Sequence, residues 1–169
     1  MELLLIPFVV ALLALLVPQK AVKVTALIGA LVTVVVGLAY LVGYKPSADF
    51  ISLIPACSES CSKPFFMSYG YDGVGLTMVV LTNIIVFLIL LSNYDNDKFS
   101  TSKRFNALIF FMQFALIGVF LSLDGLLFYI FWELSLIPVF LLFLWYGEKE
   151  KRTALMKFFI YTFIGSLAM

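Results

Sequence analysis

The stretch FYIFWELSLIPVF, residues 128–140, places one carboxylate, Glu133, in the middle of an apolar run. The nearest charged residues along the chain are Asp124 and Glu148, and both carry the same sign as Glu133. At the centre of a bilayer helix an acidic side chain costs about 2.5–3.5 kcal/mol on insertion scales. A partner or a function must therefore offset the cost of burying Glu133.

The composition around this stretch is that of an integral membrane protein. Of the 169 residues, 63% are hydrophobic and 12% are charged, whereas soluble domains carry about 25% charged residues. The net charge of +1 argues against nucleic acid as a partner. The chain has no His and two Cys, too few ligands for a zinc site or an iron–sulfur cluster. We therefore expect the lipid bilayer as the surroundings and no cofactor, metal or redox centre in this chain.

Apolar runs of about 20 residues predict membrane-spanning helices, and the sequence contains five of them and the start of a sixth. The five predicted spans are 3–17, 22–42, 73–91, 105–121 and 125–146, and the sixth begins near Thr153. We expect two spans in residues 1–43, an external loop at 44–72, and spans three to six in residues 73–169. No capping Gly, basic cluster or Pro closes the sixth run, so we expect a fragment that ends inside a span.

The Lys and Arg residues predict the orientation, because cytoplasmic loops carry an excess of them. Lys45 and Lys63 fall in the loop at 44–72, and eight basic residues follow the odd-numbered spans. These eight are Lys20, Lys23, Lys98, Lys103, Arg104, Lys149, Lys151 and Arg152. The excess predicts that the N-terminus lies outside, and we expect the membrane to be a bacterial inner membrane. Cys57 and Cys61 then face an oxidising compartment, where they form either a disulfide or two free thiols.

Three spans each place one polar side chain near mid-membrane. Glu133 lies nine residues past Asp124, about 13 Å at 1.5 Å per residue, and Asn83 and Gln113 lie near the centres of their own spans. If the three side chains converge, they form a polar centre. The alternative for Asn83 and Gln113 is a structural hydrogen bond between helices, worth about 0.6 kcal/mol. For Glu133 we expect a function, because an intramembrane carboxylate marks an ion or proton pathway by default.

Three further residues are candidates for supporting Glu133. Tyr129 precedes it by one turn and shares its helix face. Pro138 deprives the carbonyl of Leu134 of its helical donor and is expected to bend the helix one turn past the acid. Lys157 lies one turn into the sixth span, too close to the cytoplasmic end to pair with Glu133. The basic partner of Glu133 is therefore expected on a later helix.

Three motifs resemble a known family. They are GYDGVGLTMVVLT at 70–82, FWELSLIPVFLLFLWYG at 131–147 and RTALMKFFIYTFIGSL at 152–167. They resemble the antiporter-like membrane subunits of respiratory complex I, most closely chain M of NADH–quinone oxidoreductase. The Trp-Glu pair, the Pro five residues after the Glu, and the Trp-x-Gly that follows favour this chain within the family. The resemblance covers about residues 70–169.

The resemblance implies a fold of 14 transmembrane helices, of which this chain holds the N-terminal part. It implies a non-redox subunit that couples NADH:quinone electron transfer to proton translocation, with the other complex I membrane subunits as partners. Glu133 matches the fifth-helix glutamate of the family, which pairs with a Lys on the seventh helix, beyond the end of this sequence.

Two other functions remain open from the sequence. A subunit of a multi-chain cation/proton antiporter resembles the same family through the same glutamate. A helical scaffold or assembly module without transport is the other alternative, and a charge-neutral replacement of Glu133 separates it from both transporters.

Overall fold

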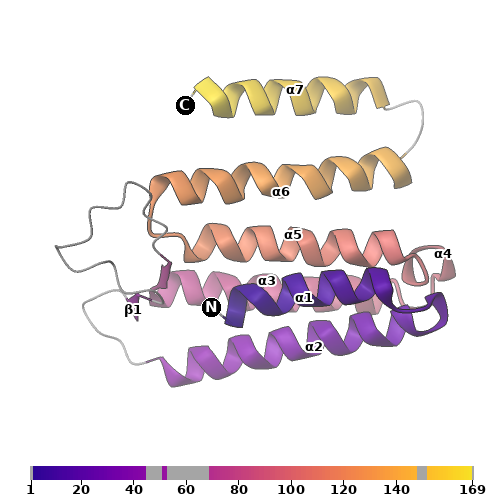
Figure 1. Ribbon diagram of the computed structural model, residues 1–169, viewed down its shortest axis with the longest axis horizontal. Coiled ribbons are helices and arrows are strands. Elements are labelled where there is room, and N and C mark those ends of the chain that lie inside the picture. The colour runs from indigo at the N-terminus through magenta and orange to yellow at the C-terminus, as the bar shows by residue number, and fades with distance from the viewer. Residues whose placement is uncertain (1, 45–50, 53–68, 148–151, 169) are drawn as a thin grey trace.

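The computed structural model describes residues 2–44, 51–52, 69–147 and 152–168. This part of the chain is a stack of antiparallel helices (Figure 1). The long helices are α1 (Glu2–Leu16), α2 (Gln19–Gly43), α3 (Gly73–Ser92), α5 (Lys103–Leu121), α6 (Gly125–Tyr146) and α7 (Arg152–Ala168), and α4 (Asp97–Ser100) is a single turn. Each long helix begins and ends within about three residues of a predicted apolar run. The sequence had no signal for α4, which lies in the connection between α3 and α5.

Four of these helices are long and apolar enough to cross a membrane, namely Ala21–Gly43 of α2 and the whole of α3, α5 and α6. With 15 and 17 residues, α1 and α7 are shorter than the roughly 20 residues of a typical span. The described chain is thus an all-helical membrane protein with four candidate spans. The prediction of five spans and the start of a sixth is not confirmed at α1 and α7, and it stays a prediction there.

The helices pack as a bundle of four with two further helices on one side. Helix α5 is central, because it packs against α1, α3 and α6, while α2 packs against α3 and α1. Helix α7 packs on α6 and lies on the far side of it from the bundle (Figure 1). Contact between α5 and α6 is close because Gly118 has no side chain, and a Cβ there would collide with the ring of Phe131.

Two apolar clusters form the core, one toward each end of the bundle. The cluster near the 44–72 connection includes Leu76, Leu121 and Phe131. The cluster near the opposite end includes Ala30 and Phe110. Between the two clusters lies a layer of polar side chains, which is described below.

Polar residues at the helix ends serve as caps. The carboxylate of Asp72 accepts a hydrogen bond from the backbone N–H of Gly75 at 2.6 Å, and Asp124 accepts one from Leu126. The hydroxyl of Ser102 caps α5 through Phe105. Such caps satisfy backbone donors that have no partner within the helix. These acids therefore have structural roles at the helix ends.

A pair of two-residue strands joins parts of the 44–72 connection. Strand β1 (Ile51–Ser52) pairs antiparallel with β2 (Gly70–Tyr71), with Ile51 opposite Tyr71 and Ser52 opposite Gly70. Strands this short leave no alternating pattern in the sequence, so no strand was expected here. Cys57 and Cys61 lie outside the described residues, so the choice between a disulfide and two free thiols stays open.

Candidate functional site

The polar layer at the centre of the bundle consists of Thr33 on α2, Asn83 on α3 and Gln113 on α5. All three side chains are buried, with exposed fractions of 3%, 1% and 0%. Each residue lies between members of the two apolar clusters along its own helix. The layer is therefore a polar cross-section through an otherwise apolar bundle.

Hydrogen bonds connect the three residues across three helices. The amide nitrogen Nε2 of Gln113 donates to Oδ1 of Asn83 at 2.8 Å and to Oγ1 of Thr33 at 3.1 Å. The amide nitrogen Nδ2 of Asn83 donates to the backbone carbonyl of Thr33 at 2.8 Å. The hydroxyl of Thr33 donates to the carbonyl of Ala30 in its own helix. Among the described residues, Oε1 of Gln113 is a buried acceptor without a partner.

Gly37 makes room for this network one turn after Thr33. A Cβ at Gly37 would lie 2.8 Å from Nδ2 of Asn83. Small residues let membrane helices approach closely enough for hydrogen bonds between them. The α2–α3 contact is therefore fitted to the Asn83 amide.

Glu133 lies at the same depth as this layer, but it is on the face of α6 that is turned away from the layer. It follows the first residue of α6 by eight positions, and Gln113 precedes the last residue of α5 by eight, so each lies about 12 Å from the same end of the bundle. The α6 residues that pack toward α5 are Leu127, Phe131 and Pro138. Glu133 is two residues from Phe131, about 200° around the helix.

The side of α6 that carries Glu133 is the side on which α7 packs. Phe140 lies two turns further along the same face, and its ring lies 4.6 Å from that of Phe159 on α7. Among the described residues, Oε1 of Glu133 is buried without a hydrogen-bond partner. The structure thus brings Asn83 and Gln113 together, whereas Glu133 faces away from them.

The three supporting candidates take different places. Tyr129 lies one turn before Glu133, with its hydroxyl close enough to interact with the carboxylate. Pro138 lies within α6 and is fully buried. Lys157 is exposed on α7. Since Phe159 lies opposite Phe140, Lys157 is displaced from Glu133 by about 13 Å along the helix axes. That Lys157 is not the partner of Glu133 stays a prediction.

Thr33 is the member of the polar layer that sequence reasoning missed. A single Thr in an apolar helix gives a weak signal, because its hydroxyl usually bonds to a carbonyl of the preceding turn. Thr33 does so through Ala30 and also accepts from Gln113. In the described residues no group of three or more Cys, Asp or Glu side chains is placed to hold a metal ion.

The comparisons with known proteins bear on the segment that contains Glu133. Residues 122–169 match the family described as NADH:quinone oxidoreductase/Mrp antiporter, TM. The resemblance to antiporter-like complex I subunits is confirmed.

Two curated relatives extend this likeness over more of the chain. NADH-quinone oxidoreductase subunit M of Rhodobacter capsulatus is 33% identical over 147 residues, which are 87% of this chain and 28% of that protein. F(420)H(2) dehydrogenase subunit M of Methanosarcina mazei is 41% identical over 102 residues, 60% of this chain and 20% of that protein. The chain thus spans about a fifth to just over a quarter of the length of these relatives.

A solved structure shares the fold. The membrane-bound sulfane sulfur reductase, an archaeal respiratory membrane complex, contains a chain that matches 99% of this one with a TM-score of 0.72 and 20% identity. The match covers 26% of that chain. This likeness shows the fold, whereas the two curated relatives are named as subunits of an NADH-quinone oxidoreductase and of an F(420)H(2) dehydrogenase.

Proposed function

We propose that this chain forms part of an antiporter-like, proton-translocating membrane subunit of a respiratory complex of the complex I type. Glu133 is the observation that carries the proposal. It is an acid at mid-membrane depth, with one buried carboxylate oxygen that has no partner among the described residues, and it lies within the segment that matches the antiporter family. Such a carboxylate fits a group that takes up and releases a proton during transport.

The partner of Glu133 is proposed to be a Lys on a helix that follows in the full subunit. Glu133 faces the α7 side of α6, away from the Thr33–Asn83–Gln113 layer, so a helix that packs near α6 and α7 would meet it. Tyr129 lies next to the carboxylate and can orient it by hydrogen bonding. In this proposal Glu133, Tyr129 and Pro138 belong to the pathway, while Asn83 and Gln113 hold the bundle together.

The wider assignments follow from the same proposal. Helices α1 and α7 are proposed to span the membrane with the other four, in the N-terminal part of a 14-helix fold with an external N-terminus. The subunit is proposed to lie in a bacterial inner membrane beside other complex I membrane subunits and to carry no cofactor. The proposed reaction couples NADH:quinone electron transfer to proton translocation. Relatives named for NADH and for F(420)H(2) both resemble this chain, which supports an electron donor site on other subunits.

A second candidate function is a subunit of a multi-chain cation/proton antiporter. The description of the matching family names both the oxidoreductase and the Mrp antiporter. Purification from the native membrane separates the two functions. Co-purifying subunits that oxidise nicotinamide and bind quinone support the respiratory complex, whereas small antiporter chains support the second function.

The experiment that tests the proposal is Glu133→Gln in the intact complex. The amide keeps the shape of the side chain and removes the charge, so assembly should be retained. Positioned proton-transfer groups typically contribute roughly 10²–10⁴-fold to a rate, and we expect proton pumping to fall by about tenfold or more. Electron transfer to quinone should slow with it, because the two are coupled. The measurements are the rate of proton pumping and the rate of nicotinamide oxidation, taken separately in membranes with equal complex content.

Two controls accompany this variant. Glu133→Asp keeps the acid on a shorter side chain and should retain part of the pumping. Ser135→Ala changes a neighbouring residue whose hydroxyl donates to the Trp132 carbonyl of its own helix, and it should pump normally. A Glu133→Gln complex that assembles and pumps like the wild type would favour the scaffold function and overturn the proposal.

A further inference from the structure

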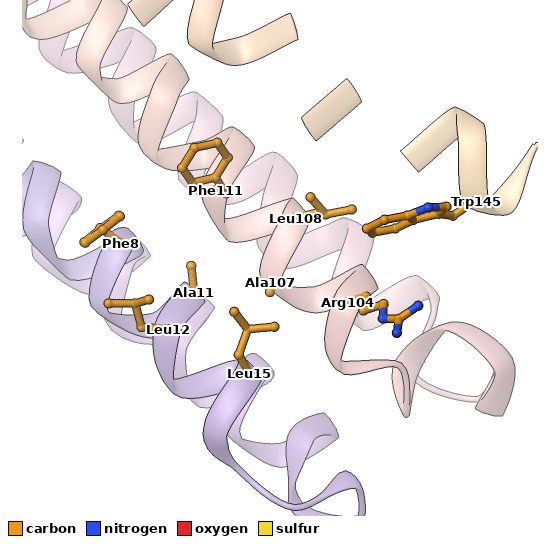
Figure 2. A pocket seen from close by; sticks show the side chains of 9 residues that line it. All are labelled: Phe8, Ala11, Leu12, Leu15, Arg104, Ala107, Leu108, Phe111 and Trp145. Atoms are coloured by element: carbon orange, nitrogen blue, oxygen red, sulfur yellow. The ribbon is translucent and has the colours of Figure 1, made fainter. Parts of the chain in front are cut away.

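An apolar groove lies between α1 and α5, close to the end of the bundle where α5 begins. Its volume is about 330 Å³, within the range of about 300–1,000 Å³ that is typical of small-molecule pockets. Helices α1 and α5 each contribute four lining residues and α6 contributes Trp145. Arg104 is the one charged residue among the nine, and Figure 2 shows it at one end of the groove, beside Trp145.

The groove runs along the two helices from this charged end toward the middle of the bundle. Leu15 and Arg104 lie at one end, and Phe8 and Phe111 lie at the other (Figure 2). Seven residues separate the two ends on each helix, which corresponds to about 10 Å. Apart from Arg104 the residues along this length are apolar, so the groove suits an apolar occupant. An unbranched hydrocarbon chain fits such a groove.

Two basic side chains lie at the charged end of the groove, where Leu15 and Arg104 are. The guanidinium of Arg104 lies 5.6 Å from the ring centroid of Trp145 and is exposed. The ammonium of Lys103 donates to the backbone carbonyl of Leu15 at 3.4 Å, so it lies beside the same opening. Among the described residues no carboxylate pairs with Arg104. Its planar fork of N–H donors is thus available for the paired oxygens of a phosphate.

The position in the bilayer matches this charge pattern. This end of the bundle carries the Lys and Arg excess that predicts the cytoplasmic side. Trp145 and Tyr146 lie there as the aromatic residues that are typical of the membrane interface. The groove therefore opens at headgroup depth and extends into the hydrocarbon region.

We propose that this groove binds one acyl chain of an anionic phospholipid, with Arg104 and Lys103 on its phosphate. The chain fills the apolar channel along Leu12 and Leu108, and the headgroup lies against the Arg104–Trp145 pair. Basic pockets between transmembrane helices on the cytoplasmic side are typical sites for anionic headgroups. The site is separate from Glu133, so the lipid-binding proposal is tested independently of the proposed proton pathway.

The test uses the protein purified in mild detergent from its native membrane, together with its natural partners. The probe is phosphatidylglycerol with a photoreactive group in one acyl chain, and cross-links are mapped by mass spectrometry. We expect labelling on the peptides that contain Phe8–Leu15 and Arg104–Phe111. Arg104→Gln removes one of the two basic side chains proposed to contact the headgroup, and it should lower the labelling about fivefold.

Matched variants separate the groove from the general surface. Leu12→Trp fills the groove from a half-exposed position and should block labelling. Leu13→Trp changes the adjacent residue, which is similarly exposed but outside the groove, and should not block labelling. Arg152→Gln removes another exposed basic residue at the same end of the bundle and should leave labelling unchanged.

Four outcomes would overturn the proposal. Equal labelling of the Leu12→Trp and Leu13→Trp proteins would exclude the groove as the site. Equal labelling by a phosphatidylcholine probe would remove the role of net charge, and full competition by inorganic phosphate would indicate a simple anion site. Absence of labelling on both peptides in the wild-type complex would indicate that a protein segment covers the groove.

Discussion

The hydrogen bond between Gln113 and Asn83 predicts a measurable coupling between α5 and α3. The two substitutions are Gln113→Met, which keeps the length of the side chain, and Asn83→Ala. Hydrogen bonds between membrane helices contribute about 0.6 kcal/mol on average and at most about 1.7 kcal/mol. Gln113→Met removes two of them, a loss of about 1.2 kcal/mol. It also removes Oε1, a buried acceptor without a partner among the described residues, so we expect a net loss near 1 kcal/mol.

The double variant should lose less than the sum of the two single losses. Each single substitution removes the shared bond, while Asn83 and Gln113 each keep a hydrogen bond to Thr33. The shared bond is therefore counted twice in the sum. We expect a coupling energy of about 1 kcal/mol, between the average for one such bond and its upper limit. Unfolding in mixed detergent micelles, followed by the fluorescence of Trp132 and Trp145, measures each free energy.

A matched control replaces Thr82 by Val. The hydroxyl of Thr82 donates to Met78 within its own helix, so this change should be additive with Gln113→Met. A coupling below about 0.3 kcal/mol between Gln113 and Asn83, no larger than the usual scatter of independent sites, would refute the hydrogen bond as a link between helices. Because we assign Gln113 to structure, the Gln113→Met complex should pump protons normally once assembled. Loss of pumping in that assembled complex would instead place Gln113 in the pathway.

Two other predictions concern packing and orientation. Gly118→Ala should destabilise the protein by about 1–3 kcal/mol through overpacking, because the new Cβ would collide with Phe131. Gly165→Ala is the control: its Cβ would have no atom within 4 Å, so the change should be neutral or stabilising by up to about 1 kcal/mol. Equal effects of the two changes in the same unfolding assay would contradict the α5–α6 contact. Cys57 and Cys61 should react with an impermeant thiol reagent in intact cells after reduction, because the Lys and Arg excess at the other end of the bundle predicts that their loop lies outside. Labelling that needs access to the cytoplasm would reverse this predicted orientation.

The sequence by itself determined the helices, because the length of an apolar run sets the length of a helix in a bilayer. It also determined how far along its helix, and so at what depth in the bundle, each polar residue lies. Counting residues at a fixed rise places Asn83, Gln113 and Glu133 near the middle of their helices. The same apolar runs fix the class of the protein, and the motif around Glu133 indicates its family.

Only the tertiary structure decided which polar residues meet. Residues 125–146 are apolar on nearly all sides, so the sequence contains no polar stripe that would tell the α5 side of α6 from the α7 side. The packing of Phe131 against Gly118 sets that rotation and turns Glu133 away from Gln113. Thr33 joins Asn83 and Gln113 because Gly37 lets α2 approach α3. Depth is a property of one helix and can be counted along the chain, whereas rotation is a property of a pair of helices and depends on how their side chains fit.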